Sequence, residues 1–143
     1  MNLVSDALVG TILSLDWGLK KIGVATSDAR GIAITPRALW RRAPAGQTWS
    51  FSRADKDDLA RLLKDWEPSV LVLGDPRGSR GEMTEASEHA ARLAKRLQEF
   101  CGLPVHLVAE TLTSWESRHA ANEDSAAAAL LIESFLRERK IIV

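Results

Sequence analysis

Two apolar segments near the start of the chain are separated by only three residues, and this spacing constrains the fold more than any other feature. Residues 11–17 (TILSLDW) and 21–27 (KIGVATS) both have the composition of buried strands. A connection this short excludes a parallel crossover, so the two strands must form an antiparallel hairpin. A third strand is expected at 32–40, interrupted or bulged near Pro36, because proline cannot donate to a strand ladder.

The rest of the chain alternates between helices and short apolar strands. Apolar residues at helical spacing predict one helix between Ser52 and Pro68, and a longer one that ends at Gly102. The apolar segments 69–73 and 103–109 follow these helices as strands. Such alternation implies parallel strands joined by right-handed crossovers.

Three other segments complete the expected order of elements. A glycine-containing loop is expected at 74–81, a short helix at 113–121 and a last helix at 123–139. The sequence therefore predicts an α/β fold with a mixed five-stranded sheet flanked by helices, in which three antiparallel strands precede the parallel ones. We expect residues 1–143 to form a single domain.

Charge and cysteine content bear on the partners and the compartment. Lys and Arg number 19, as do Asp and Glu, and this balance is unusual for a strong nucleic-acid binder unless a basic patch forms locally. The single cysteine, Cys101, fits a reducing compartment and is expected to pack in the core. Residues 1–10 contain no Lys or Arg, and no apolar run is long enough to span a membrane, so a cytoplasmic location is expected.

Three carboxylates occupy positions where a carboxylate is costly. Asp16 ends an apolar strand, Glu110 follows the strand VHLVA, and Asp124 shares a helical face with Ala128 and Leu131. Converging carboxylates repel one another, and a hard divalent ion such as Mg²⁺ or Mn²⁺ removes that conflict. Two such ions about 4 Å apart can activate water and stabilise the leaving oxygen in phosphodiester hydrolysis.

Each of these carboxylates also has an ordinary structural explanation. Asp16 can bond the turn around Gly18, Glu110 can open a surface loop, and Asp124 can stabilise a helix N-terminus. Spacing alone does not choose between these roles and a metal site.

Longer motifs in the sequence resemble the YqgF family, also called RuvX, the pre-16S rRNA nucleases. Residues 16–28 (DWGLKKIGVATSD) resemble the family pattern D-V-G-x-K-R-I-G-V-A-x-S-D. Residues 74–76 (GDP) resemble its G-L-P, 110–114 (ETLTS) its E-R-L-T-T, and 124–132 (DSAAAALLI) its D-x-x-A-A-x-x-I-L. The motifs occur in the same order from Thr11 to Phe135.

The resemblance implies a ribonuclease H-like fold related to RuvC-type Holliday-junction resolvases. It implies that Asp16, Glu110 and Asp124 are the catalytic carboxylates and ligands of Mg²⁺ or Mn²⁺. It also implies a nucleic-acid substrate, with 5′-end maturation of pre-16S rRNA in ribosome biogenesis as the leading role. No membrane partner is expected.

The sequence departs from the family pattern near the expected site. Asp75 stands in place of Leu, Gly78 in place of a common Asn, Ala109 in place of an Asp, and Thr111 in place of an Arg. The segment between Thr113 and Asp124 is also shorter than the often basic insert of the family. The residues that grip the substrate are therefore reduced in number, although all three carboxylates are retained.

Basic residues in the predicted loops are candidates for phosphate contacts. These candidate substrate-binding residues are Lys20, Lys21, Arg77 and Arg80. Because they are few, we expect weak binding, so that activity needs a homodimer or an assembling ribosomal particle to hold the RNA. Trp40, with its neighbours Arg41 and Arg42, could stack on a base, although core packing is the commoner role of such a Trp. Asp28 is a candidate fourth acidic group, but its position after a strand favours a role in a turn.

Other functional classes remain open at the level of sequence. The chain can be a Holliday-junction resolvase-like DNase, or a non-catalytic nucleic-acid- or protein-binding module that retains the fold. The segment around Gly18 also resembles the first phosphate loop of sugar-kinase and actin-like proteins, which need two such domains.

Overall fold

The computed structural model describes residues 10–42, 47–111 and 126–139. Its strands are β1 (Ile12–Trp17), β2 (Lys21–Ser27), β3 (Ile34–Arg41), β4 (Val70–Arg77) and β5 (Val105–Thr111). Its helices are α2 (Arg53–Trp66), α3 (Glu85–Cys101) and α5 (Ala126–Glu138).

The five strands form one mixed sheet in the order β3-β2-β1-β4-β5. β1 pairs antiparallel with β2, which pairs antiparallel with β3. On its other side β1 runs parallel to β4, and β4 runs parallel to β5. The predicted α/β class and the mixed five-stranded sheet are confirmed. The carboxyl ends of β1, β4 and β5 therefore lie at one edge of the sheet, where α/β proteins tend to bind ligands.

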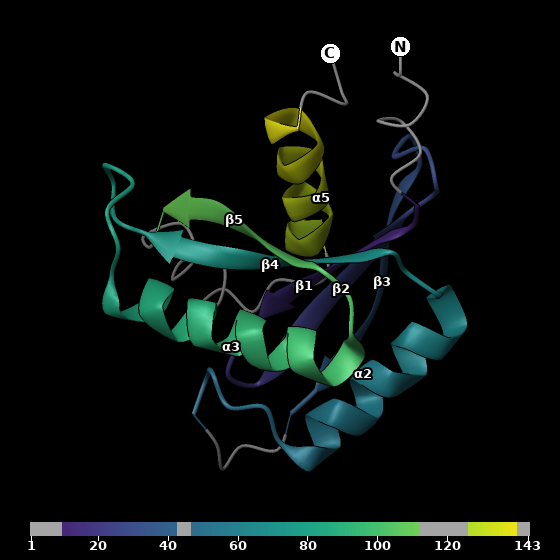
Figure 1. Cartoon of the computed structure of the whole chain (residues 1–143), viewed down its shortest axis with the longest axis horizontal. Helices are drawn as coiled ribbons and strands as arrows, with labels where there is room; N and C mark the ends of the chain where they lie inside the picture. Colours follow the sequence, from purple (N-terminus) through teal and green to yellow (C-terminus); the bar gives the residue numbers. More distant parts are fainter. Residues whose placement is uncertain (1–9, 43–46, 112–125, 140–143) are drawn as a thin grey trace.

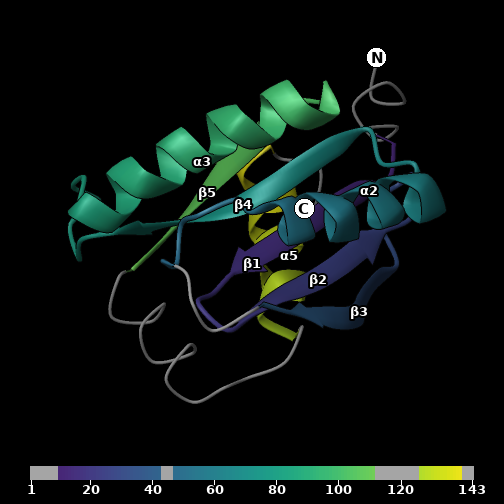
Figure 2. The same cartoon turned by 90° about the horizontal axis from the view of Figure 1, so that it is seen from below.

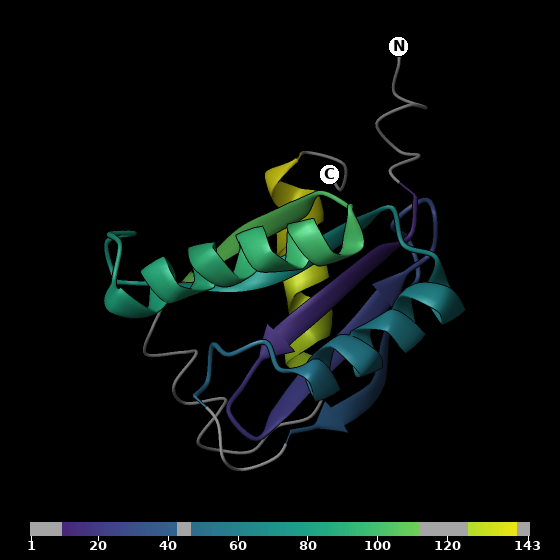
Figure 3. The same ribbon diagram turned by 60° about the horizontal axis from the view of Figure 1, so that its bottom comes forward.

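Helices cover both faces of this sheet. Figure 3 shows α2 and α3 in front of the strands and α5 behind them, and Figure 1 shows α5 crossing the strands rather than following them. Seen from below in Figure 2, α3 lies along β4 and β5, while α2 lies over β1 and β2. The result is a three-layer arrangement with an apolar core on each side of the sheet.

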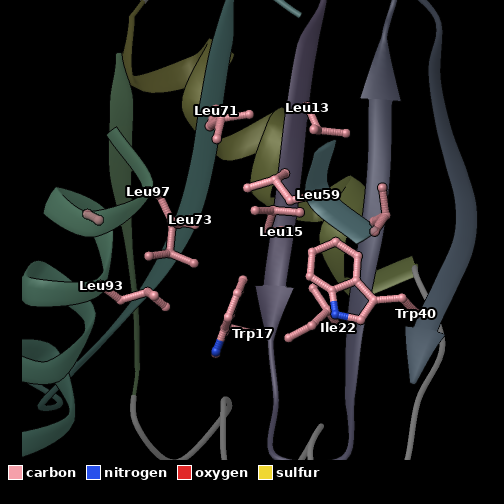
Figure 4. Packing of buried hydrophobic residues seen from close by; sticks show 12 residues of the cluster. Leu13, Leu15, Trp17, Ile22, Trp40, Leu59, Leu71, Leu73, Leu93 and Leu97 are labelled. Carbon is pink, nitrogen blue, oxygen red and sulfur yellow. The ribbon is translucent and has the colours of Figure 1, made fainter. Parts of the chain in front are cut away.

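The core beneath α2 and α3 is built from alternate residues of the strands. Along β1, side chains alternate between the two faces, so Leu13, Leu15 and Trp17 point to the same side (Figure 4). They pack against Leu59 of α2 and Leu93 of α3, all of which are at most 1% exposed. Trp17 also contacts the rings of Trp40 and Phe51 edge to face. Cys101 is partly buried against this core, as expected.

The core beneath α5 uses the other alternate residues. The buried residues that form it are Ile12, Ala25, Val70, Val72, Val108, Ala128, Leu131, Ile132, Phe135 and Leu136. The helix passes over the sheet from Ser14, whose hydroxyl contacts the Ala128 carbonyl, toward Gly31, which lies against Leu136. Gly31 lies in the turn after β2, beyond Ser27, whose hydroxyl accepts a hydrogen bond from the Ile12 amide. α5 therefore crosses the sheet from the middle of β1 to the end of the sheet at which β1 begins.

The ends of the two long helices follow from local chemistry. Ser52 and Asp55 form a reciprocal capping box at the start of α2, and Glu67 ends that helix in a left-handed conformation before Pro68. Thr84 caps α3 in the same way, and Gly102 ends it with a φ of 71°. The predicted helix ends at Pro68 and Gly102 are confirmed.

The third strand differs from its prediction at two points. It begins at Ile34 rather than at residue 32, because Asp28 closes a turn by accepting a hydrogen bond from the Ile32 amide and donating one to Ala33. The bulge lies where Ala38 and Leu39 stand opposite Gly23, and not at Pro36, which pairs with Ala25. β3 is an edge strand, where a proline without an N–H is tolerated.

The fourth and fifth strands extend further than predicted. β4 continues through residues 74–77, which were expected to be loop, because β5 pairs with it as far as Thr111 opposite Arg77. The fifth strand starts at Val105 and includes Glu110, so that residue lies within the strand rather than after it. This shift places Glu110 on a fixed face of the sheet.

Some expected elements lie outside the described residues. These are the short helix at 113–121 and the first three residues, 123–125, of the last helix. Within the described ranges, no helix is long and apolar enough to cross a membrane.

Candidate functional site

Asp16 lies near the carboxyl end of β1, on the face of the sheet that α5 covers. It is the penultimate residue of β1 and is 8% exposed. Its side chain shares a face with Ile12 and Ser14, because alternate residues of a strand point the same way. That face is opposite the one on which Trp17 packs. The sequence LSLD thus puts an acidic side chain on the α5 side of the sheet, while Leu13 and Leu15 build the core on the other side.

Glu110 lies on the same face, two strands away from Asp16. It is half-buried on β5, two residues after Val108, which belongs to the core under α5. Its carboxylate leans over Gly74 of β4, where a Cβ atom would lie 2.7 Å from Glu110 Oε1. Gly74 therefore provides the space that the carboxylate occupies.

The register of the sheet brings the two carboxylates toward one another. Leu15 of β1 pairs with Leu73 of β4, so Asp16 and Gly74 are the next residues along two adjacent parallel strands. Glu110 reaches Gly74 from the other side. Asp16 and Glu110 thus flank a strand position that has no side chain. Two acidic groups on either side of an open position offer oxygen ligands of the kind that Mg²⁺ and Mn²⁺ prefer.

Asp124, the third predicted ligand, lies outside the described residues. Among the residues that the structure does describe, no group of three His, Cys, Asp or Glu side chains could hold a metal ion. The described part of the candidate site therefore consists of Asp16, Glu110 and the first turns of α5.

A groove of about 240 Å³ opens beside Glu110, between β5 and α5. Val108 and Thr111 of β5 line one side, and Ala127 and Leu130 of α5 line the other. Leu130 is 57% exposed, which is unusual for a leucine of a packed helix. The groove gives a ligand access to the Glu110 carboxylate from solvent.

The predicted phosphate-binding residues are distributed around the same edge of the sheet. Lys20 is exposed in the turn after β1, and Lys21 is partly exposed at the start of β2, so both lie close in the chain to Asp16. Arg80 is exposed in the loop after β4, where its backbone amide bonds Glu82.

Arg77, a predicted phosphate contact, is held by bonds within the protein. Its Nε lies 2.7 Å from Asp75 Oδ2, and its Nη1 donates to the Gly81 carbonyl. The alternation of β4 puts both Asp75 and Arg77 on the α3 side of the sheet, with Leu71 and Leu73, and not on the side of Glu110. Asp75, which departs from the family pattern, thus neutralises one of the four expected phosphate contacts.

Trp40 packs in the core, which was the interpretation that the sequence favoured, and its ring is not available to stack on a base. The Trp40 ring is 7% exposed and its Nε1 donates to Asp55 Oδ1 at 3.2 Å. The side chain of Arg42 is 5% exposed and forms an ion pair with Asp55 at 3.1 Å. Arg42 also donates to the carbonyl oxygens of Gly18, Thr48 and Ser50, so it fastens the β1–β2 turn to the start of α2. Of the basic pair, only Arg41 is exposed.

Asp28 has the predicted turn role. It follows β2 at the sheet end away from Asp16, and its carboxylate accepts a hydrogen bond from the Ile32 amide at 2.8 Å. That backbone hydrogen bond is the main reason why the pKa of Asp28 lies below its ordinary value.

Sequence reasoning missed two residues that shape the site. Ser14 is fully buried two positions before Asp16 on the same face, and its hydroxyl donates to the Ala128 carbonyl at 2.6 Å. Gly74 was noticed only as part of a motif, although its missing side chain makes room for Glu110. The sequence did contain a signal for Ser14, because it is a polar residue in an apolar strand, two positions before Asp16. No sequence signal pointed to the contact of Gly74.

Comparison with solved structures agrees with the ribonuclease H-like architecture. Thermus thermophilus RuvC in complex with a Holliday junction substrate aligns with a TM-score of 0.57 at 11% identity, over 90% of this chain and 95% of that one. A second structure of Thermus thermophilus RuvC aligns with a TM-score of 0.55 at 12% identity, over 92% and 97% of the two chains. At these identities the likeness shows the fold alone, and it confirms the fold implied by the motifs.

Sequence comparison identifies closer relatives. A protein of Azotobacter vinelandii named "Putative pre-16S rRNA nuclease" is 36% identical over 140 residues, which cover 90% of this chain and 94% of the relative. A protein of the same name from Parasynechococcus marenigrum is 37% identical over 139 residues, which cover 90% of this chain and 82% of the relative. The family model described as "RuvX: Holliday junction resolvase" matches residues 10–138. Since this match spans most of the chain and relatives above 30% identity align along nearly all of it, the chain belongs to the RuvX family.

Proposed function

We propose that the chain is a metal-dependent endonuclease that hydrolyses phosphodiester bonds in the 5′-end maturation of pre-16S rRNA. The observation that carries the proposal is the position of Asp16 and Glu110 on one face of the sheet, on either side of Gly74. Two carboxylates that converge on one position of a sheet repel each other, and a divalent cation shared between them removes that repulsion. The names of the relatives support rRNA as the substrate.

Asp124 is proposed as the third carboxylate of this site. The path of α5 supports it, because the helix starts near the middle of β1 and runs toward the amino end of that strand. The described start of α5 also supports it, because Ala128 contacts Ser14, which lies two positions before Asp16 on the same face of β1.

The described residues fit a hard divalent cation. Asp16 and Glu110 offer oxygen ligands, and the space above Gly74 would be filled by any Cβ. When bound, Mg²⁺ or Mn²⁺ would lower the pKa of a bound water and neutralise charge that develops on the phosphate. The task of the protein is to hold the carboxylates in register and to admit the phosphate through the groove beside Glu110.

Substrate binding is proposed to rest on Lys20, Lys21, Arg77 and Arg80. The first two adjoin Asp16 through the β1–β2 turn, and the last two belong to the carboxyl end of β4 and its loop. Because Asp75 pairs with Arg77, the grip on phosphates is weak. We therefore propose that the protein acts with a second copy or on an assembling ribosomal particle. A single domain and a cytoplasmic location are part of the same proposal.

A second candidate function is a resolvase-like DNase that acts on branched DNA. The description of the matching family and the Holliday junction in the RuvC complex favour it. The same carboxylates would serve either substrate, because the scissile bond is a phosphodiester in both.

Cleavage assays with two substrates test both functions. The metal-free protein is given Mn²⁺ with a pre-16S rRNA fragment or with a four-way DNA junction, and the Asp16→Asn protein is the control. Cleavage of the RNA at its 5′ end by the parent alone is the expected result. Preferential cleavage of the junction would select the second function. Cleavage that persists without a divalent ion would contradict the metal centre.

A further inference from the structure

Ser14 is a buried polar residue that neither the family motifs nor the carboxylate site accounts for. It is 0% exposed in the middle of the apolar strand β1, between Leu13 and Leu15. Its hydroxyl donates to the carbonyl oxygen of Ala128 at 2.6 Å, joining residues 114 positions apart. A polar group is retained in such an environment when its hydrogen bond is made.

The packing around this bond lets the first turn of α5 approach the sheet closely. Ala127 and Ala128 are the buried residues of that turn, and Ala25 and Gly74 lie on the sheet face below α5. Further along α5 the buried side chains are larger, and they set the distance between the helix and the sheet. They are Leu131, Ile132, Phe135 and Leu136. Small side chains alone permit a close approach but do not fix its direction, whereas a hydrogen bond has a preferred distance and angle.

The height of α5 above the sheet bears directly on the two described carboxylates. Leu131 of α5 lies beside Gly74, because a Cβ atom added to Gly74 would be 3.6 Å from Leu131 Cδ1. The same position is the one that the Glu110 carboxylate covers. Ala127 lines the groove that leads to Glu110. Ser14 itself is two residues from Asp16 on the same face of β1. A change in the position of the first turns of α5 would therefore shift the wall against which Glu110 rests.

We propose that Ser14 is a positioning residue for the metal centre, acting through its hydrogen bond to Ala128. This inference rests on the proposed function, because it assumes that the carboxylates under α5 hold a divalent cation. Ser14 does not touch the ion or the substrate. It fixes the first turns of α5 against β1, and with them the separation between the helix and the acidic groups of the sheet.

Removing the hydroxyl should leave the fold intact. The Ala128 carbonyl lies inside α5, where it also accepts the helical hydrogen bond of its own backbone ladder. Ser14→Ala removes one oxygen atom without leaving a buried donor unpaired. The expected effect is a helix that is less tightly held at its first turns, rather than an unfolded protein.

A matched control is available at the other end of the same sheet. Ser27 is 4% exposed on β2, and its hydroxyl accepts from the Ile12 amide and donates to the Asp28 carbonyl. Ser27→Ala therefore also deletes a buried, hydrogen-bonded hydroxyl from the sheet, but away from Asp16 and from the first turns of α5.

The experiment compares the full-length parent, Ser14→Ala and Ser27→Ala after removal of metal. Titration calorimetry with Mn²⁺ measures the affinity, thermal unfolding without metal measures stability, and hydrogen exchange measures the protection of amides 126–132. We expect Ser14→Ala to weaken Mn²⁺ binding about tenfold, in the range found when groups that orient metal ligands are removed. We also expect faster exchange in the first turns of α5, and neither change in Ser27→Ala.

The other outcomes distinguish the role of Ser14 from the existence of the metal centre. Parent-like Mn²⁺ affinity and exchange in Ser14→Ala would overturn the role of Ser14 while leaving the proposed function standing. An equal loss of affinity in Ser27→Ala would overturn it too, because the effect would then be one of general stability. Failure of the parent to bind Mn²⁺ would instead overturn the metal centre itself, and with it the inference.

Discussion

The carboxylate of Glu110 occupies the space that a side chain at Gly74 would need. A Cβ atom at residue 74 would lie 2.7 Å from Glu110 Oε1, closer than such atoms approach in proteins, and 3.6 Å from Leu131 Cδ1. The glycine of β4 thus sets the place of a proposed metal ligand on β5. Because the obstructing atom is the end of a flexible side chain, the contact constrains the carboxylate more than the fold.

Gly74→Ala should therefore damage the site and spare the fold. We expect the new methyl group to push the Glu110 carboxylate aside and to lower nuclease activity and Mn²⁺ affinity roughly 10–100-fold, as for other changes that misplace a metal ligand. Thermal unfolding should change little, since alanine is no worse than glycine in a strand. Gly78→Ala is the control for Mn²⁺ affinity and thermal unfolding, because a Cβ there meets the exposed Glu82 instead. Full activity in Gly74→Ala would show that Glu110 is not needed where it lies.

Asp16→Asn should abolish cleavage without destabilising the metal-free protein. The change removes one negative charge from a carboxylate pair while keeping the shape of the 8% exposed side chain. Relief of repulsion between carboxylates makes the unfolding midpoint without metal equal to or higher than that of the parent. Cleavage and thermal unfolding are the two measurements, and Asp28→Asn, in the turn after β2, is the control. A variant that cleaves as fast as the parent would rule out the mechanism.

The ion pair of Arg42 and Asp55 should matter for stability rather than for catalysis. Its two side chains are 5% and 3% exposed. Asp55→Ala leaves Arg42 buried without its partner, and the expected loss of unfolding free energy is about 3–5 kcal/mol by chemical denaturation. The comparison is Asp58→Ala in the same helix, whose partner Arg61 is exposed, and there the loss should be at most about 1 kcal/mol. Similar losses in both variants would contradict this account.

The same carboxyl group makes stability depend on pH. Burial raises the pKa of Asp55, but the hydrogen bonds and charge of Arg42 and the backbone of Ser52 outweigh burial and hold the pKa below its ordinary value. This stabilisation is fully present above the unfolded pKa, about 3.9, and is lost as the pH falls through the lower folded pKa. The stability difference between the parent and Asp55→Asn should therefore shrink below about pH 4. A difference that stays constant down to pH 2 would argue against the pair.

The salt dependence of RNA binding should report how few phosphates the protein contacts. With Arg77 tied to Asp75, we expect a shallow slope equivalent to about 2–4 phosphates in a titration against a pre-rRNA fragment. Asp75→Asn keeps the size of the side chain but frees the charge of Arg77, so the slope should steepen by about one phosphate. The double variant Asp75→Asn with Arg77→Gln should return to the parent slope. A steep slope in the parent would reveal a basic surface formed by the fold.

Local sequence patterns determined the order of the elements and the position of Asp16. The three-residue connection dictated the hairpin of β1 and β2, and the apolar alternation of β1 put Asp16 among buried residues. Pro68 and Gly102 marked the helix ends, because backbone conformation at a helix end depends on the residues at that end. The motifs that resemble the RuvX family could also be recognised from the sequence alone, since they are contiguous stretches of residues.

Only the tertiary structure decided which side chains meet. The extension of β4 beyond Leu73 depends on the pairing partner that β5 supplies, so a segment that reads as loop became strand. Arg42 was considered only as a neighbour of Trp40 in a possible base contact, yet its side chain is buried because Asp55 and three backbone carbonyls converge on it. Ser14 contacts Ala128 across 114 residues of chain. Such contacts follow from the packing of whole elements against the sheet, and no pattern within a local window of sequence encodes them.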